Sequence, residues 1–222
     1  MDSTHSPAGE APELENIESE PQAAAEIFGD RIELARRFAG HLATTGVEWG
    51  LLGPRELPRL WSRHILNCAV MAELLDDSDV VGDIGSGAGL PGIALAIARP
   101  NTRFVLVEAM ERRVEWLQMV VDDLDLDNVR IVRSRVEELV DEEIFTVATA
   151  RAVKSLPVLI EWCTPVLGPD GRLLAIKGQS YEAEIEKAAK HIKRYRLSQP
   201  KVHTLGTEFL EVPTTVLELR RR

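Results

Sequence analysis

The feature that most restricts the fold is a glycine-rich loop between a short apolar strand and a helix. Val80–Ile84 is an apolar, strand-like run, and residues 85–92 then contain four glycines. Glycines at alternate positions let the backbone turn tightly into a helix, and they let a ligand approach without meeting Cβ atoms. The loop therefore predicts a cofactor site at the end of a strand in an α/β domain.

Alternating strands and helices follow the loop. Repeated strand–helix units imply a parallel sheet covered on both faces, with ligands at the carboxyl ends of the strands. A hairpin at the end of the chain would add an antiparallel strand at one edge. The expected strands are 80–84, 104–107, 129–132, 145–150, 172–176, 201–205 and 212–219, with helices at 90–98, 114–121, 156–167 and 181–195 and a turn at 169–171.

The part of the chain before the loop has a different character. Residues 1–26 contain seven acids and no Lys or Arg, so residues 1–22 are expected to be a disordered acidic tail. Apolar residues at helical spacing predict a helical cap over 23–78, and residues 79–222 form the expected α/β domain. The net charge of −10 hides a basic region, because residues 187–207 hold six bases and no acid. Net charge alone therefore excludes no partner.

Two cofactor templates fit the glycine loop. Gly87, Gly89 and Gly92 match the dinucleotide fingerprint G-x-G-x-x-G, whereas residues 83–89 match the D-x-G-x-G loop of S-adenosylmethionine-dependent methyltransferases. The strand ends at Gly85, two residues too early for the dinucleotide register. Asp83 would repel a pyrophosphate and attract an ammonium or sulfonium cation. Glu108, after the next strand, suits the ribose of either cofactor. The methyltransferase template is therefore favoured.

Three segments together resemble one family, the bacterial 16S rRNA guanine-N7 methyltransferases, also called glucose-inhibited division protein B. They are Asp83–Ile93 (D-I-G-S-G-A-G-L-P-G-I), Arg63–Leu66 (R-H-I-L) and Ala150–Val153 (A-R-A-V). The resemblance runs from about Arg31 to Lys177. It implies a Rossmann-like S-adenosylmethionine-dependent methyltransferase fold, with a mostly parallel seven-stranded sheet, an antiparallel edge hairpin and a helical N-terminal cap.

The resemblance also implies which residues hold the cofactor. The glycine loop would line the methionine part, Glu108 would take the ribose, and Val136 with Glu137 would meet the adenine. Arg151 would lie beside both the cofactor and the incoming base, and it is the one catalytic candidate. The full expected cofactor set is Asp83, Gly85, Ser86, Gly87, Gly89, Leu90, Glu108, Val136, Glu137 and Arg151.

The residues at the strand ends fit a reaction at guanine N7. A cysteine nucleophile, as methylation of pyrimidine carbon-5 requires, is not expected, because Cys68 and Cys163 fall in helical segments and are predicted core thiols. Guanine N7 carries no proton, so no general base is needed. Alignment and exclusion of water can then supply about 7–11 kcal/mol of the barrier. Arg151 could donate to guanine O6, or pair with Asp83 or Glu108 instead.

RNA must be held as well. Basic side chains near the strand ends and along the helix at 181–195 suit phosphate contacts, and His64 could act near the site or make a structural hydrogen bond. The four tryptophans are expected in the core rather than stacked on bases. The expected RNA-binding residues are Arg63, His64, Arg133, Arg135, Lys154, Lys177, Lys187, Lys190 and Arg194.

The first hypothesis is transfer of a methyl group to a guanine in the 530 loop of 16S rRNA, as the resemblance implies. The expected partners are 16S rRNA and the small ribosomal subunit, with no metal, no membrane, a cytoplasmic location and a monomeric state. One alternative is an enzyme of the same fold that methylates a small metabolite. Another is a non-catalytic dinucleotide- or RNA-binding module.

Overall fold

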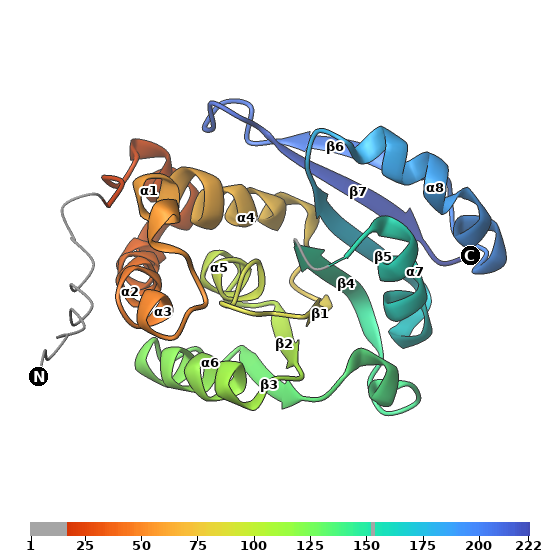
Figure 1. Ribbon diagram of the computed structural model, residues 1–222, viewed down its shortest axis with the longest axis horizontal. Helices are drawn as coiled ribbons and strands as arrows, with labels where there is room; N and C mark the ends of the chain where they lie inside the picture. Colours follow the sequence, from red (N-terminus) through yellow and green to blue (C-terminus); the bar gives the residue numbers. More distant parts are fainter. Residues whose placement is uncertain (1–16, 152–153) are drawn as a thin grey trace, which may run out of the picture.

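The computed structural model describes residues 17–151 and 154–222, and a seven-stranded sheet forms its centre (Figure 1). The strand order is β3-β2-β1-β4-β5-β7-β6. Strands β1 to β5 pair in parallel, and β7 runs antiparallel to both β5 and β6. The predicted sheet and its edge hairpin are confirmed. The strands are β1 (Val80–Ile84), β2 (Arg103–Glu108), β3 (Val129–Arg133), β4 (Phe145–Arg151), β5 (Leu167–Lys177), β6 (Lys201–Leu205) and β7 (Thr214–Arg220).

Helices cover both faces of the sheet. The cap, α5 and α6 pack on one face, whereas η6, α7, η7 and α8 pack on the other. The cap consists of α1 (Gln22–Phe28), η2 (Gly29–Arg31), α2 (Ile32–Ala43), α3 (Thr45–Glu48), η3 (Pro54–Arg59), the π-helical η4 (Leu60–Leu66), α4 (Asn67–Ala69) and η5 (Val70–Leu74). The others are α5 (Gly92–Ala98), α6 (Glu111–Asp123), η6 (Val136–Leu139), α7 (Leu156–Cys163), η7 (Thr164–Val166) and α8 (Tyr181–Arg194).

Alternation along the strands explains these two layers. On β5, Leu174 and Ile176 join the core on the cap side, and Leu173 and Ala175 join the core beneath α7 and α8. Successive side chains of a strand point to opposite faces, so a strand buried on both sides is apolar throughout. The cap shares its apolar core with α5 and α6, which makes it part of the same packed unit.

The chain reverses its direction across the sheet between β1 and β4. The connections that carry α5 and α6 lead outward to β2 and β3, whereas those that carry α7 and α8 lead the other way to β5 and the hairpin. Adjacent connections therefore leave β1 and β4 toward opposite faces. In such a sheet, ligands bind in the crevice at the carboxyl ends of these two strands.

Two sequence predictions need correction. Residues 169–171 were expected to form a turn before a strand at 172–176, but they form a bulge within a longer β5, where Asp170 has φ +59°. The register on β4 shifts there, from Phe145 opposite Leu167 to Val147 opposite Arg172, because the extra residues loop out without ending the pairing.

The expected acidic tail is also shorter than predicted. The Glu18 backbone N–H donates to the Leu57 carbonyl at 2.9 Å, and its carboxylate accepts the Ser62 N–H at 3.0 Å. The Glu20 carboxylate pairs with Arg36 at 2.6 Å. The segment from residue 17 onward therefore belongs to the cap, and the rest of the predicted tail, residues 1–16, lies outside the described residues.

Candidate cofactor and active site

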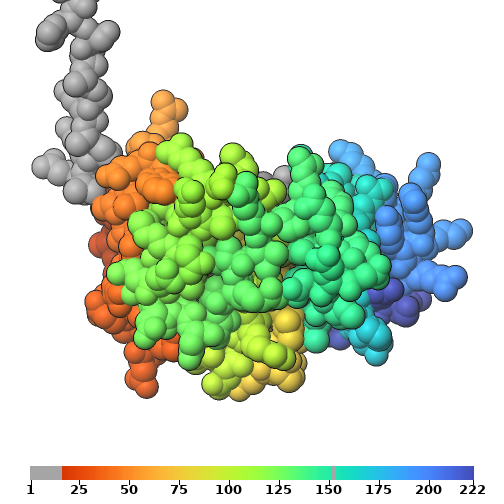
Figure 2. Space-filling view, turned by 90° about the horizontal axis from the view of Figure 1, so that it is seen from below, coloured from red at the N-terminus to blue at the C-terminus, as the bar shows by residue number. Residues whose placement is uncertain are grey.

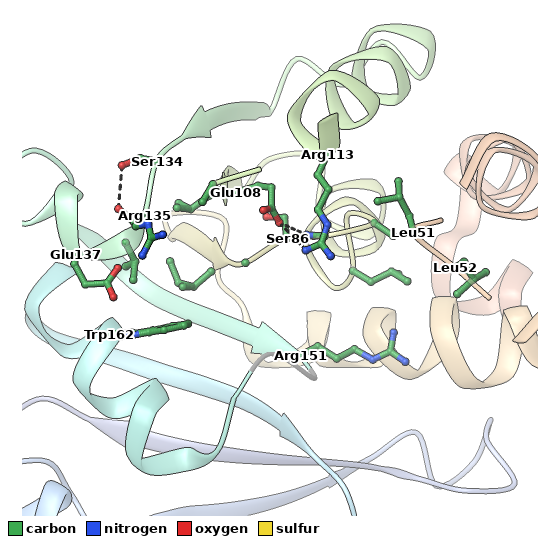
Figure 3. Close-up of a pocket in the computed structure, with 18 of the residues that line it drawn as sticks. Leu51, Leu52, Ser86, Glu108, Arg113, Ser134, Arg135, Glu137, Arg151 and Trp162 are labelled. Atoms are coloured by element: carbon green, nitrogen blue, oxygen red, sulfur yellow. Dashed lines mark hydrogen bonds and ion pairs between the residues drawn. The ribbon is translucent and has the colours of Figure 1, made fainter. Parts of the chain in front are cut away.

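A cavity of about 580 Å³ opens at the carboxyl ends of β1, β2 and β4, where the chain reverses across the sheet (Figure 3). It is bounded by the glycine loop, the turn after β3, the end of β4 and part of the cap. The lining residues are Leu51, Leu52, His64, Ile84, Gly85, Ser86, Gly87, Ala88, Leu90, Val107, Glu108, Ala109, Arg113, Ser134, Arg135, Val136, Glu137, Arg151 and Trp162.

The glycine loop needs its glycines for conformation as well as for space. Gly85, Gly87 and Gly89 have φ values of +74°, +55° and +73°, in the left-handed region that other residues rarely adopt. A Cβ atom at Gly87 would have only the Gly85 carbonyl within 4 Å, at 3.9 Å. At Gly89 it would lie 2.4 Å from Ile93. Gly89 therefore serves packing behind the loop, whereas Gly85 and Gly87 face the cavity.

Asp83 lies behind the loop and does not line the cavity. Its side chain is buried, Oδ2 accepts the Gly92 N–H at 3.1 Å, and Oδ1 has no hydrogen-bond partner among the described residues. Burial, with a smaller contribution from Glu108, raises the pKa of Asp83 to about 7. The expected direct contact with a cofactor is therefore absent from this arrangement, and Asp83 instead sets the position of the loop.

Glu108 connects the end of β2 to the glycine loop. Its carboxylate accepts the Gly87 N–H at 3.1 Å through Oε2 and the Met110 N–H at 2.9 Å through Oε1. Arg113 lies 3.5 Å from Oε2. Each carboxylate oxygen has two acceptor sites, so Glu108 can also accept from a pair of hydroxyl groups in the cavity.

The turn after β3 forms the far end of the cavity. Val136 is buried, Glu137 is exposed at the rim, and Trp162 of α7 lies half-buried beside them (Figure 3). An apolar side chain, an aromatic ring and a carboxylate together suit a flat heteroaromatic ring with polar edges. The prediction that Trp162 is a core residue is confirmed in part, because its side chain packs against the core beneath α7 and α8 but also lines the cavity.

Arg151 extends from the end of β4 toward the cap (Figure 3). Its Nη2 donates to the Arg63 carbonyl at 3.0 Å and lies 3.0 Å from His64 Nδ1, and its Nη1 lies 3.5 Å from Cys68 Sγ. The alternative in which Arg151 pairs with Asp83 or Glu108 is wrong, because the guanidinium reaches the cap instead. The rest of the Ala150–Val153 motif, residues 152–153, lies outside the described residues.

A second cavity, of about 1030 Å³, lies between η4, the ends of β4 and β5, and the loop before β7. Arg63, Lys154 and Lys177 line it, and Arg151 lines both cavities. Lys177 is nevertheless occupied, since it pairs with Glu184 at 2.8 Å and donates to the Lys154 carbonyl at 2.9 Å. The expected phosphate contact of Lys177 would need this pair to break.

The other expected RNA contacts are spread more widely. Arg135 lines the first cavity, whereas Arg133 pairs with Glu111 on the surface of α6. Helix α8 begins just after the carboxyl end of β5 and runs back toward the amino half of that strand, where Leu197 pairs with Arg221 beside Gly171, so Lys190 and Arg194 lead away from both cavities. Figure 2 shows this C-terminal region at the end of the molecule opposite the cap. Lys187 lies on the same helix.

The cysteines do not supply a nucleophile. Both thiols are buried, and burial raises the pKa of Cys163 to about 12 and also raises that of Cys68. A thiol with a raised pKa stays protonated near neutral pH. The prediction of packed thiols is confirmed, although Cys68 also contacts the guanidinium of Arg151.

The sequence reasoning missed nine residues of the first cavity. Five of them adjoin predicted residues in the segments at the ends of β1, β2 and β3, and the other four are Leu51, Leu52, Arg113 and Trp162. The two leucines come from the loop between α3 and η3, which the chain folds over the glycine loop from more than 30 residues away. Arg113 could have been found, since it lies in the first turn of the helix that follows Glu108. The other three have no local signal.

Comparison with known proteins decides the family. The model of the family described as "GidB: rRNA small subunit methyltransferase G" matches residues 31–212. The chain belongs to this family. A relative named ribosomal RNA small subunit methyltransferase G from Pseudarthrobacter chlorophenolicus is 54% identical over 90% of this chain and 93% of its own length. A relative of the same name from Corynebacterium glutamicum strain R is 48% identical over 90% and 92%.

Solved structures show the same fold at low identity. The structure of M. jannaschii TYW2 in complex with AdoMet matches with a TM-score of 0.56 at 18% identity, over 72% of this chain and 76% of its own. A SAM-dependent O-methyltransferase from Thermotoga maritima matches with a TM-score of 0.54 at 15% identity, over 70% and 64%. The fold is that of the S-adenosylmethionine-dependent methyltransferases, as predicted.

Across residues 17–151 and 154–222, no helix is long and apolar enough to cross a membrane. Within the same ranges, no group of three or more His, Cys, Asp or Glu side chains is arranged to hold a metal ion.

Proposed function

We propose that this protein transfers a methyl group from S-adenosylmethionine to N7 of a guanine in 16S rRNA, guanine 527 of the 530 loop. Membership of the rRNA small subunit methyltransferase G family supports the reaction and the substrate class. The observation that carries the proposal is that Arg151 lines two cavities, one whose residues suit a nucleoside cofactor and the other bordered by Arg and Lys side chains.

The residues of the first cavity fit S-adenosylmethionine. The open space above Gly87 forms a cradle that a Cβ atom would fill, and Glu108 keeps acceptor capacity for ribose hydroxyls. Val136, Glu137 and Trp162 suit the adenine. Beneath the loop, the Asp83 carboxyl lies buried behind the end that would receive the positively charged methionine part, and its Oδ1 has no hydrogen-bond partner among the described residues. The bound cofactor supplies an electrophilic methyl group on sulfur.

The chemistry at guanine N7 asks little of the protein beyond alignment. The N7 lone pair lies in the ring plane and carries no proton, so no group must accept one before transfer. The structure offers no activated cysteine among its described residues, and both thiols have raised pKa values. What the chain contributes is orientation of the base by Arg151 and exclusion of water, as expected for a reaction driven by proximity.

Contacts with RNA phosphates would come from Arg and Lys side chains around the two cavities. Arg63 and Lys154 border the second cavity, and Arg135 borders the first. The second cavity is wide enough for an unstacked nucleotide, and single-stranded loops are the usual targets of sequence-specific RNA recognition. RNA binding through these Arg and Lys side chains should weaken as the salt concentration rises. Contacts by Arg133, Lys187, Lys190 and Arg194 would need RNA that also covers other faces of the molecule.

The same proposal gives the setting of the protein. The small ribosomal subunit is its partner, and a substrate of this kind implies the cytoplasm. The cap and residues 79–222 act as one unit, because they share an apolar core. A monomeric state and independence from metal stay predictions.

The test is transfer of tritiated methyl groups from S-adenosylmethionine to small subunits from cells that lack this protein. Large subunits from the same cells are the control. We expect incorporation into small subunits alone, with transfer that falls as salt rises. Tight binding of S-adenosylhomocysteine without transfer to subunits or free 16S rRNA would favour the small-metabolite enzyme instead.

A further inference from the structure

Arg151 stands where the two cavities meet. Among the described residues it alone lines both, one holding the glycine loop and Glu108 and the other bordered by Arg63 and Lys154. Its side chain carries a fixed positive charge, and none of the described carboxylates lies within ion-pair distance of it. Without an ion pair, this long and flexible side chain needs other contacts to fix its conformation.

The cap supplies that support through η4. The Arg63 carbonyl and His64 Nδ1 each lie 3.0 Å from Arg151 Nη2, and Cys68 Sγ lies 3.5 Å from Nη1. A guanidinium has five N–H groups. These contacts use the two on Nη2 and one on Nη1, which leaves the Nε–H and one Nη1–H to donate elsewhere.

Glu56 fixes which nitrogen of His64 can accept. The Glu56 Oε2 atom lies 2.7 Å from His64 Nε2, and a carboxylate can only accept, so Nε2 carries the proton. In the neutral ring, Nδ1 then keeps its lone pair and accepts from Arg151. Burial, and after it the charges of Arg151 and Arg63, lower the pKa of His64 despite the opposing effect of Glu56, which favours this neutral form.

Glu56 is itself held firmly. Its carboxylate also accepts from Arg59 at 2.7 Å and lies 3.6 Å from Arg63. The hydrogen bonds with Arg59 and then His64 lower the pKa of Glu56 to about 2. It therefore stays ionised, and the proton on His64 Nε2 stays where Arg151 needs it. Both His64 and Arg63 lie in a π-helical turn, a rare geometry that occurs often at functional sites.

We infer that Glu56 and His64 are positioning residues that hold the guanidinium of Arg151, the residue that lines both cavities, with its remaining N–H groups left to donate to the acceptor guanine. This inference rests on the proposed function, since Arg151 has a guanine to orient only if RNA is the substrate. The contacts run from Glu56 to His64 Nε2 and from His64 Nδ1 to Arg151. The sequence singled out His64 and Arg151 separately, but nothing pointed to Glu56.

If the role of His64 were purely structural, its contact with Glu56 would matter and its contact with Arg151 would not. In that case its bond to Glu56 merely fastens η3 to η4, and Nε2 is the atom that matters. Two substitutions separate the roles, because the amide of Asn reaches the place of Nδ1 and the amide of Gln reaches the place of Nε2. His64→Asn keeps an acceptor for Arg151, whereas His64→Gln keeps a donor for Glu56.

The experiment measures kcat and KM for methyl transfer to small subunits, together with S-adenosylhomocysteine binding and thermal melting of each full-length variant. We expect His64→Gln to lower kcat about tenfold or more, with binding and melting close to wild type, and His64→Asn to restore most of that loss. In an Arg151→Ala background, His64→Gln should add no further loss, because His64 acts through Arg151.

His41→Gln is the matched control. His41 lies in the same cap and makes the same kind of contact, with Asp123 at 2.8 Å, but it lines neither cavity. Its transfer should stay within about twofold of wild type. The positioning role would be overturned if His64→Asn and His64→Gln lowered kcat equally. It would also be overturned if His64→Gln lowered kcat as much in the Arg151→Ala background as in the wild type. Absence of transfer by the wild-type protein would instead overturn the proposed function, and the positioning role with it.

Discussion

At the residue scale, Glu108 both fixes the conformation of the glycine loop and contributes to the affinity of the first cavity for S-adenosylhomocysteine. Its carboxylate is buried and accepts two backbone N–H groups, from Gly87 and Met110. We expect Glu108→Ala to weaken S-adenosylhomocysteine binding about 10- to 100-fold, since charge-assisted hydrogen bonds contribute about 1.5–3 kcal/mol. Isothermal titration calorimetry measures the change. Glu111→Ala, three residues along and exposed, is the control, and a similar loss there would refute the assignment.

Asp83 makes a prediction about pH. An acid whose pKa is raised on folding binds a proton between its unfolded and folded values, here between 3.8 and about 7. Its contribution to stability is therefore complete below pH 3.8 and is lost as pH rises through about 7. Urea unfolding of the ligand-free protein from about pH 5 to about pH 8 should show a larger fall in the wild type than in Asp83→Asn. Equal falls would mean that the buried carboxyl is already ionised.

Much of the site was predictable from single residues, and the exceptions share a cause. Gly85, Glu108 and Val136 each lie at the end of a strand or within three residues after it, so motif and strand order together bring them to the carboxyl ends of the strands. The support of Arg151 comes instead from His64, 87 residues earlier in the chain. Such contacts depend on how the cap docks, which no spacing within the α/β units records.

At the element scale, the cap is tied to the C-terminal hairpin by two reciprocal hydrogen bonds. Asn67 Nδ2 donates to Thr214 Oγ1 at 2.7 Å, and that hydroxyl donates to the Asn67 carbonyl at 2.9 Å. Thr214→Val keeps the shape but removes both bonds, so the free energy of unfolding should fall by about 1–3 kcal/mol. Chemical denaturation measures it. Thr204→Val, exposed on β6, should change it by less than about 0.5 kcal/mol, and equal effects would contradict the tie.

Elements were easiest to predict where periodicity was strong. The apolar runs of β1 to β4 and the stripe of α8 have the expected bounds to within a residue or two. The bulge in β5 was missed because Pro169, Asp170 and Gly171 have the composition of a turn, and only pairing with β4 keeps them in the sheet. The π-helical turn of η4 was missed because helical spacing does not distinguish it from an α-helix.

At the scale of the whole molecule, the boundary of the acidic N-terminus can be tested by truncation. Removal of residues 1–22 deletes the contacts of Glu18 with Leu57 and Ser62 and of Glu20 with Arg36. We expect that truncation to lower the free energy of unfolding by about 1–3 kcal/mol, whereas removal of residues 1–16 should leave it unchanged. Differential scanning calorimetry compares the two. An equal loss in both would move the boundary into the first 16 residues.

The charge of the whole molecule conceals how its bases are arranged. The total of −10 includes the acidic N-terminus, while bases gather near the cavities and along α8. The gathering of basic residues in an acidic protein was therefore predictable from the order of the charges, but the distance of Lys190 and Arg194 from the cavities depends on the direction of α8. Helix direction follows from topology, which composition does not contain.

The most direct test of the account is the position and chemical identity of the methyl group. Small subunits methylated by this protein would be treated with borohydride and aniline, which cleave RNA at N7-methylguanine, and the break would be mapped by primer extension. The account predicts one new stop, at guanine 527 of 16S rRNA, that is much weaker when Arg151→Ala replaces the wild type. Incorporated methyl groups without a stop, or a stop elsewhere, would contradict it.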